Sequence, residues 1–231
     1  MKKIAILQSN YIPWKGYFDI INSADEFILY DTAQYTKNDW RNRNIIKTFQ
    51  GKNWITIPVK HSISQKINEI KIHDKKWNIK HWKTLSANYS NAKYFGYYKE
   101  LFENLYLNIT ETFLSKINYL FITEITKILN INTKISWSTD YIIEGERSEK
   151  LVNICKQAGA NEYISGPTAK CYLNESLFEK ENIKVTWFDY SDYPEYSQLF
   201  PPFEHGVSIL DLIFNEGQNA PKFMKSFHTK S

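Results

Sequence analysis

The sequence predicts an α/β fold, built on an open, mainly parallel, Rossmann-like sheet with a helical insertion. Short apolar runs alternate with amphipathic segments near both ends of the 231-residue chain. The first three elements fit within about thirty residues, the length of a βαβ unit. The middle of the chain is helical instead. We therefore expect a single α/β domain over residues 1–231, with a helical block at about 77–130 inserted within it.

The N-terminal elements follow from local patterns. "KKIAILQ" is a continuous apolar run, typical of a parallel strand buried on both faces. Residues 16–24 predict a short helix, and "DEFILYD" predicts the next strand, ending at Asp31. "NIIKTFQGKNWITIPVK" predicts a β-hairpin with residues 50–53 as its turn, and "EIKIH" predicts one more strand.

The middle and the C-terminal part complete the alternation. "NIKHWKTLSANYSNA" has apolar residues at helical spacing, and residues 94–129 carry two longer amphipathic helices. "TKISWST", "EYIS" and "IKVTWFDY" predict strands, separated by the helices "SEKLVNICKQAGA" and "ESLFEKEN". Ser148 is the expected N-cap of the first of these and Gly159 its stop. A long irregular loop precedes a last helix between Ser208 and Gly217.

Composition limits the class of protein. Cys155 and Cys171 form no disulfide framework or metal spacing, which fits a reducing cytoplasm. The apolar run in "MKKIAIL" is too short for a signal peptide, and no segment approaches the roughly 20 apolar residues of a membrane span. We expect a cytoplasmic protein without membrane insertion. The net charge of +4 fits a solvated basic face or an anionic partner, either a nucleotide or RNA. We expect no DNA partner, no cofactor and no metal.

Polar and aromatic side chains follow several predicted strands. Ligands of such sheets bind beyond the carboxyl ends of the strands, near the point where strand order reverses. We therefore expect one wall of a pocket after the first strand, with contributions from the second strand and from "EYIS". The expected residues are Gln8, Asn10, Tyr11, Trp14, Asp31, Gln34, Ser165 and Lys170.

Phosphate-binding motifs are missing. The chain has neither a Walker loop nor G-x-G-x-x-G. "PWKGY" stands where nucleotidyltransferase-like proteins carry a His-x-Gly-His motif at a helix start, so a nucleotidyltransferase-like form of the fold is expected, without the catalytic histidines. The helix N-terminus still offers free N–H groups for a phosphate.

Arginine is concentrated in one loop. Arg41 and Arg43, two of the three arginines in the chain, lie beside Trp40 in "DWRNRN". A guanidinium is a planar fork for carboxylate or phosphate, so the loop predicts recognition of an anion, with all three residues in contact with substrate. The alternative is packing of the arginine stems on Trp40.

Acid–base candidates are few. His81 stands alone in an amphipathic helix and is the best general-base candidate, although a buried structural histidine fits equally well. Asp31 is the second catalytic candidate. Asp211 either contributes to the site or holds a loop by hydrogen bonds. No histidine pair has metal-ligand spacing.

Together these segments resemble the WbqC-like protein family. The resemblance rests on "QSNYIPWKGYFDII", "ADEFILYDTAQYTKNDWRNRN", "WITIPV", "YISGPTAKCYL", "FPPFEHGVSILDLIFNEG" and Lys80-His81, and it spans nearly the whole chain. The family usually reads Gln-Pro-Asn-Tyr at the first turn. Ser9 replaces the proline here, which loosens the turn without removing Gln8 or Tyr11.

The resemblance implies a transferase of surface-polysaccharide (O-antigen) biosynthesis that attaches an aminoacyl group, glycyl in particular, to the amine of a nucleotide-linked amino sugar. His81 or Asp31 would be the base, and Arg41 and Arg43 would hold the anionic carrier. The partners would be the nucleotide-linked amino sugar and, as one possible donor, an aminoacyl-tRNA.

Two other functions stay open. One is an ATP-using, adenylate-forming or nucleotidyl-transferring enzyme that works in the same cleft. The other is a non-catalytic sugar- or nucleotide-binding partner protein, which would bind tightly without turnover in a pocket that lacks a perturbed acid or base.

Overall fold

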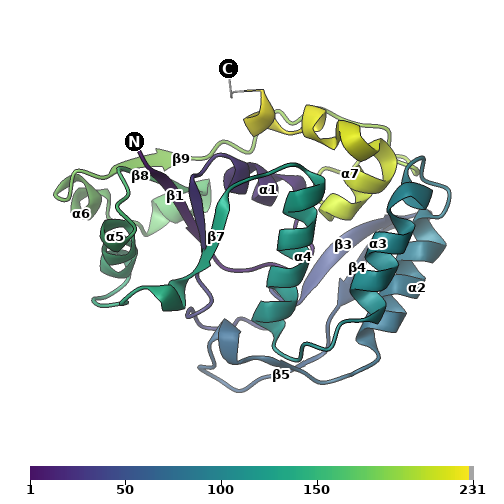
Figure 1. Ribbon diagram of the computed structural model, residues 1–231, viewed down its shortest axis with the longest axis horizontal. Helices are drawn as coiled ribbons and strands as arrows, with labels where there is room; N and C mark the ends of the chain where they lie inside the picture. Colours follow the sequence, from purple (N-terminus) through teal and green to yellow (C-terminus); the bar gives the residue numbers. More distant parts are fainter. Residues whose placement is uncertain (229–231) are drawn as a thin grey trace.

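A five-stranded parallel sheet forms the centre of the computed structural model, which describes residues 1–228 (Figure 1). Its order is β7-β2-β1-β8-β9, and every neighbouring pair is parallel. This order is Rossmann-like, and it confirms the predicted parallel sheet. The strands are β1 (Lys3–Leu7), β2 (Glu26–Leu29), β7 (Lys134–Trp137), β8 (Glu162–Ser165) and β9 (Lys184–Trp187).

Strand order reverses beside β1. The chain first proceeds from β1 to β2 and β7 on one side, and then returns to β8 and β9 on the other. Ala5 of β1 is paired with Phe27 of β2 and with Ile164 of β8. The crevice beyond the carboxyl ends of β1 and β8 is therefore where such a sheet binds its ligand.

Helices cover both faces of the sheet because side chains alternate along β1. Ile4 and Ile6 pack with α5 (Ser148–Gln157) and α6 (Glu175–Glu179), whereas Ala5 joins a larger core on the opposite face. That larger core contains apolar residues from the remaining helices, which are α1 (Lys15–Asn22), α2 (Trp77–Tyr89), α3 (Phe95–Leu107), α4 (Leu114–Ile128) and α7 (Ile209–Glu216).

Three helices lie in the range predicted for the helical block. They do not form a core of their own, because α2, α3 and α4 share the larger core with α1, α7 and one face of the sheet. Part of this contact is the Tyr119 ring of α4, which lies 5.1 Å from the Trp137 ring of β7. The alternation of strands and helices was thus predictable, whereas the joint core was not.

Two antiparallel ribbons lie outside the main sheet. β3 (Arg43–Thr48) pairs with β4 (Gly51–Thr56), and β5 (Val59–Lys60) pairs with β6 (Lys71–Ile72). The predicted hairpin is present, but its turn at residues 50–53 was placed wrongly. Thr48 is paired with Gly51, so Phe49 and Gln50 form the turn, and Gly51 takes a φ of +104° that suits glycine.

The helix caps agree in part with the prediction. Ser208 caps α7 by accepting the Leu210 N–H at 3.3 Å, and Gly217 follows that helix with a φ of +57°. Ser148 is the first residue of α5 rather than its N-cap, and its Oγ accepts the Asn174 N–H instead, at 3.0 Å. Over residues 1–228, no helix is both long enough and apolar enough to cross a bilayer.

Candidate functional site

The turn after β1 is held in a strained conformation. Ile12 has a φ of +37°, which is unusual for a β-branched residue. Asn44 Nδ2 donates to the carbonyl oxygens of Tyr11 and Ile12, both at 2.9 Å, and Ser208 Oγ donates to that of Ile12 at 2.8 Å. Such strain persists where surrounding bonds enforce it, and it is common at ligand sites.

A cavity of about 270 Å³ opens beside this turn, at the carboxyl end of β1. We call it the aromatic cavity because two indole rings contribute to its wall. Three of its residues were predicted from the sequence, namely Asn10, Trp14 and Trp40. The complete lining is Asn10, Pro13, Trp14, Trp40, Asn44 and Gly206.

Arg41 lies behind the cavity wall. Its guanidinium donates to the side-chain oxygens of Gln8 and Asn10, and it pairs with an Asp39 carboxylate oxygen at 3.4 Å. The Arg41 side chain is only 15% exposed. Since Asn10 Oδ1 accepts from Arg41, the Nδ2 group of Asn10 is left to donate to a ligand. Arg41 therefore orients the amide side chains of the first turn.

Arg43 does not share the contacts of Arg41 but stacks on a tryptophan ring. Its guanidinium carbon lies 4.1 Å from the centre of the Trp54 ring, and its Nη2 donates to the Asn38 carbonyl oxygen. The Trp54 ring in turn lies 5.1 Å from that of Trp40. Arg43 thus stacks on Trp54, the neighbour of Trp40.

Tyr11 and His81 lie in the interior. Tyr11 has no exposed surface, and its hydroxyl is 2.8 Å from His81 Nδ1 and 2.8 Å from the Tyr106 hydroxyl. His81 Nε2 is 3.1 Å from the Thr56 carbonyl oxygen. Burial lowers the pKa of His81 to about 4, so the ring is neutral. Both ring nitrogens of His81 are engaged, and neither His81 nor Tyr11 lies at the cavity wall. This geometry favours a packing role for the two residues.

Asp31 lies beneath the turn. It is 1% exposed, and its Oδ1 accepts the Ser9 N–H at 2.8 Å. Burial raises the pKa of this carboxyl, while hydrogen bonds from Ser9 and Ser115 and the charge of Arg41 oppose the shift. Asp31 does not line the cavity. Its visible role is to hold the backbone that follows β1.

The remaining predicted residues are dispersed. Gln34 is exposed and forms an isolated backbone bridge with Lys66. Ser165 is buried at the end of β8, and the exposed Lys170 places its Nζ 5.6 Å from the Trp187 ring. None of the three lines the aromatic cavity.

A buried lysine was missed by the sequence interpretation. Lys15 is 2% exposed, and its Nζ donates to the Pro194 carbonyl oxygen at 3.0 Å. Burial lowers its pKa to about 8, against the charges of neighbouring carboxylates. The only signal in the sequence was a lysine between aromatics in "PWKGY". Its Nζ faces the rings of Tyr193, Tyr196 and Phe203, at 4.9, 5.2 and 5.8 Å.

Asp211 holds the long segment between β9 and α7, here called the 188–207 loop. Its fully buried carboxylate accepts from the Tyr89 hydroxyl at 2.9 Å, the Tyr196 hydroxyl at 2.7 Å and Gln198 Nε2 at 3.0 Å. Burial raises the pKa of Asp211, and these three bonds oppose the shift. Of the two predicted roles, the structure supports the loop-holding one.

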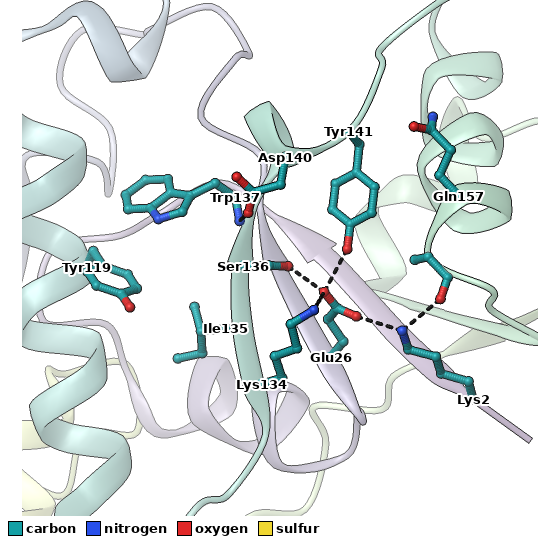
Figure 2. A pocket seen from close by; sticks show the side chains of 11 residues that line it. Lys2, Glu26, Tyr119, Lys134, Ile135, Ser136, Trp137, Asp140, Tyr141 and Gln157 are labelled. Carbon is teal, nitrogen blue, oxygen red and sulfur yellow. Dashed lines mark hydrogen bonds and ion pairs between the residues drawn. The ribbon is translucent and has the colours of Figure 1, made fainter.

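A larger cavity of about 470 Å³ surrounds Glu26 (Figure 2). The carboxylate of Glu26 is 1% exposed and accepts from Lys2, Lys134, Ser136 and Tyr141 at 2.6–2.9 Å. Burial raises the pKa of Glu26, but these four partners outweigh it and lower the pKa to about 2.

The position of this second cavity differs from that of the aromatic cavity. Glu26 and Lys134 are the first residues of β2 and β7, so the cluster lies at the amino ends of the strands. Because ligands bind at the opposite end of such sheets, we assign the Glu26 cluster to structure and the aromatic cavity to function. In the described part of the chain, no three His, Cys, Asp or Glu side chains are grouped to hold a metal ion.

Similarity to a known protein extends over almost the whole chain. An uncharacterized protein of Mycobacterium tuberculosis (strain ATCC 25618 / H37Rv), Rv1507c, is 49% identical over 227 residues, which are 97% of this chain and 98% of that relative. No solved structure matches the chain significantly. The model of the WbqC-like protein family matches residues 8–223. The chain therefore belongs to the WbqC-like protein family.

Proposed function

We propose that this protein is a transferase that attaches an aminoacyl group, glycyl in particular, to the amine of a nucleotide-linked amino sugar in surface-polysaccharide biosynthesis. The aromatic cavity is the observation that supports this function. It combines two indole rings with the amide of Asn10 at the carboxyl end of β1. Indole rings pack against the apolar faces of sugars and against nucleobases, and amides donate to hydroxyl or carbonyl oxygens.

The residues around the cavity supply orientation. Arg41 fixes the amides of Gln8 and Asn10. Both polar atoms of Asn44 are engaged, because its Nδ2 donates to two carbonyl oxygens and its Oδ1 accepts the Ile45 N–H at 2.7 Å, so Asn44 shapes the wall. A rigid wall of this kind holds a sugar amine in one position at little cost in entropy.

The proposed reaction is the aminolysis of an activated ester. The sugar ammonium first loses one proton to solvent. The neutral amine then attacks the carbonyl carbon of the aminoacyl ester, a C–N bond forms, the C–O bond to the donor breaks, and the second amine proton leaves with the departing oxygen. No ionisable side chain lines the cavity among the described residues. The rate enhancement would therefore come from holding amine and ester together.

The same observation favours a second candidate function. A cavity wall without an acid or base also suits a non-catalytic protein that binds an amino-sugar nucleotide and presents it to an enzyme. This second function predicts affinity without turnover.

One experiment tests both functions. Purified protein is incubated with UDP- and dTDP-linked amino sugars and with two glycine donors, glycyl-adenylate and glycyl-tRNA, and the products are analysed by mass spectrometry. The transferase predicts an acceptor that gains one glycyl group. Asn10→Ala should abolish this gain, and Asn91→Ala, at an exposed residue between α2 and α3, serves as the matched control.

The two possible negative results differ in meaning. Tight binding of an amino-sugar nucleotide without a glycyl product from either donor would replace the transferase by the binding protein. Absence of both binding and product would exclude both functions.

A further inference from the structure

Positive charge is concentrated in one fifth of the chain. Residues 37–83, here called the basic segment, contain twelve of the 29 lysines and arginines but three of the 25 acidic residues. The excess of positive charge in this segment is larger than the net charge of the whole chain, which is +4. The rest of the molecule is therefore net acidic, and a polyanion would be attracted to this segment in particular.

The basic segment folds on one side of the molecule. It forms both antiparallel ribbons and the first half of α2, which Figure 1 places away from α5 and α6. Of its exposed lysines, only Lys52 and Lys80 form an ion pair among the described residues, with Glu204 and Asp74. The exposed lysines are Lys37, Lys52, Lys60, Lys66, Lys71, Lys75, Lys76, Lys80 and Lys83.

The second ribbon places two lysines opposite each other. Lys60 of β5 is the cross-strand partner of Lys71 of β6. Like charges in such a position destabilise a ribbon, and an acceptor beside either ammonium reduces this cost. The first ribbon shows how the protein itself resolves the same problem: Lys47 and Lys52 are also opposed, but Lys47 donates to the Pro202 carbonyl oxygen and Lys52 pairs with Glu204 at 3.1 Å. Lys60 and Lys71 have no such oxygen acceptor in residues 1–228, although Lys71 Nζ lies 4.9 Å from the centre of the Phe113 ring.

A stack of flat side chains leads from this surface to the aromatic cavity. Arg43 lies on Trp54, and the Trp54 ring faces that of Trp40, which lines the cavity. The two tryptophans are 42% and 41% exposed. Exposed aromatic rings beside a cationic surface are the platforms on which single-stranded nucleic acids stack their bases. A nucleotide sugar would use one such ring and two phosphates, whereas the charge here extends over both ribbons.

We propose that the basic segment is the docking surface for a single-stranded RNA end, whose 3′ terminus delivers the aminoacyl ester to the aromatic cavity. The backbone phosphates lie along the lysines of β5 and β6, and the terminal bases stack on Trp54 and Trp40. The identity of the ester rests on the function proposed above, but RNA binding itself does not. In the transfer step, the C–O bond to the terminal ribose breaks, and the ribose oxygen keeps the proton from the amine.

The test measures fluorescence anisotropy of a labelled single-stranded RNA of about twelve nucleotides with the purified protein, over a series of salt concentrations. The logarithm of affinity should fall with the logarithm of salt concentration, by about 0.7 for each phosphate contact. Lys60→Gln/Lys71→Gln should therefore weaken binding and reduce this slope by about 1.4. Trp54→Ala should weaken binding about tenfold and leave the slope unchanged, because a stacked base carries no phosphate charge.

The matched control is Lys180→Gln/Lys184→Gln. It removes the same charge from exposed lysines on the side of α6 and β9. Equal RNA affinity of the two double variants would overturn the proposal, as would tighter binding of the wild type to polyglutamate or to anionic phospholipid vesicles than to RNA. A failure of the proposed function would appear in a different assay. Glycyl transfer from glycyl-adenylate requires no RNA, and RNA binding requires no sugar, so the two proposals can fail independently.

Discussion

The Lys15 ammonium donates to the carbonyl oxygen of Pro194 at 3.0 Å, and this bond joins the start of α1 to the 188–207 loop. Lys15→Met keeps an apolar stem among the surrounding rings but removes the donor. We expect faster proteolytic cleavage within the loop. The free energy of unfolding should change little, because the variant also removes the desolvation cost of a buried ammonium.

Limited proteolysis and urea unfolding check this prediction, with the exposed Lys99→Met as control. A loop that is cleaved at the wild-type rate in the Lys15 variant would show that other bonds, such as those of Asp211, suffice to hold it.

His81 provides a prediction on pH dependence. In the fold its pKa is lowered to about 4, from the ordinary value of 6.5 for a histidine side chain. Between these values the unfolded state binds more protons, so stability falls as pH decreases from 6.5 toward 4, by about 3 kcal/mol in total. His81→Gln keeps a donor and an acceptor but cannot titrate. At neutral pH the free energy of unfolding of His81→Gln should be lower than that of the wild type. This difference should become smaller as the pH is lowered.

Urea unfolding at about pH 7 and about pH 4.5 measures this difference, with the exposed His73→Gln as a control for the substitution itself. If the gap between wild type and His81→Gln stays constant, the ring is not buried in its neutral form.

Gly16 determines the position of Trp14. A Cβ at Gly16 would lie 2.7 Å from two ring carbons of Trp14, so the indole must move. Gly16→Ala should therefore reduce affinity for the amino-sugar nucleotide and change tryptophan fluorescence. Gly96→Ala is the matched control, since a Cβ added there meets no side chain or other segment within 4 Å beyond its immediate chain neighbours, and alanine in a helix stabilises by about 0.5–1 kcal/mol relative to glycine. Equal affinities of the two variants would remove Trp14 from the binding site.

Arg41→Lys tests whether the Arg41 guanidinium orients the side chains of the first turn. Lysine keeps the charge but cannot donate to Gln8 and Asn10 in the same geometry. A charge-assisted hydrogen bond contributes about 1.5–3 kcal/mol, so affinity for the amino-sugar nucleotide should fall about ten- to a hundredfold. Arg147→Lys, at an exposed position, is the control for calorimetric titration. Unchanged affinity in the Arg41 variant would show that the hydrogen bonds of Arg41 to Gln8 and Asn10 serve folding alone.

The sequence by itself determined the local features of this protein. Continuous apolar runs predicted the parallel strands, and the residues after β1 predicted one wall of a pocket. Asn10 and Trp14 were predicted in this way, and Trp40 was predicted from the arginine-containing loop, because each lies within a turn or loop that must be solvated or occupied by a ligand.

The tertiary structure alone decided which polar residues remain available to contact a ligand. His81 and Tyr11 look like site residues in a linear chain, but the packing of α2 against the first turn joins their side chains and removes them from solvent. Lys15 looks like a surface lysine, yet the 188–207 loop folds over it, with Pro194 located 179 residues downstream. Neither outcome could be predicted from spacing, because a hydrogen bond between residues distant in sequence depends on how helices and loops share one core.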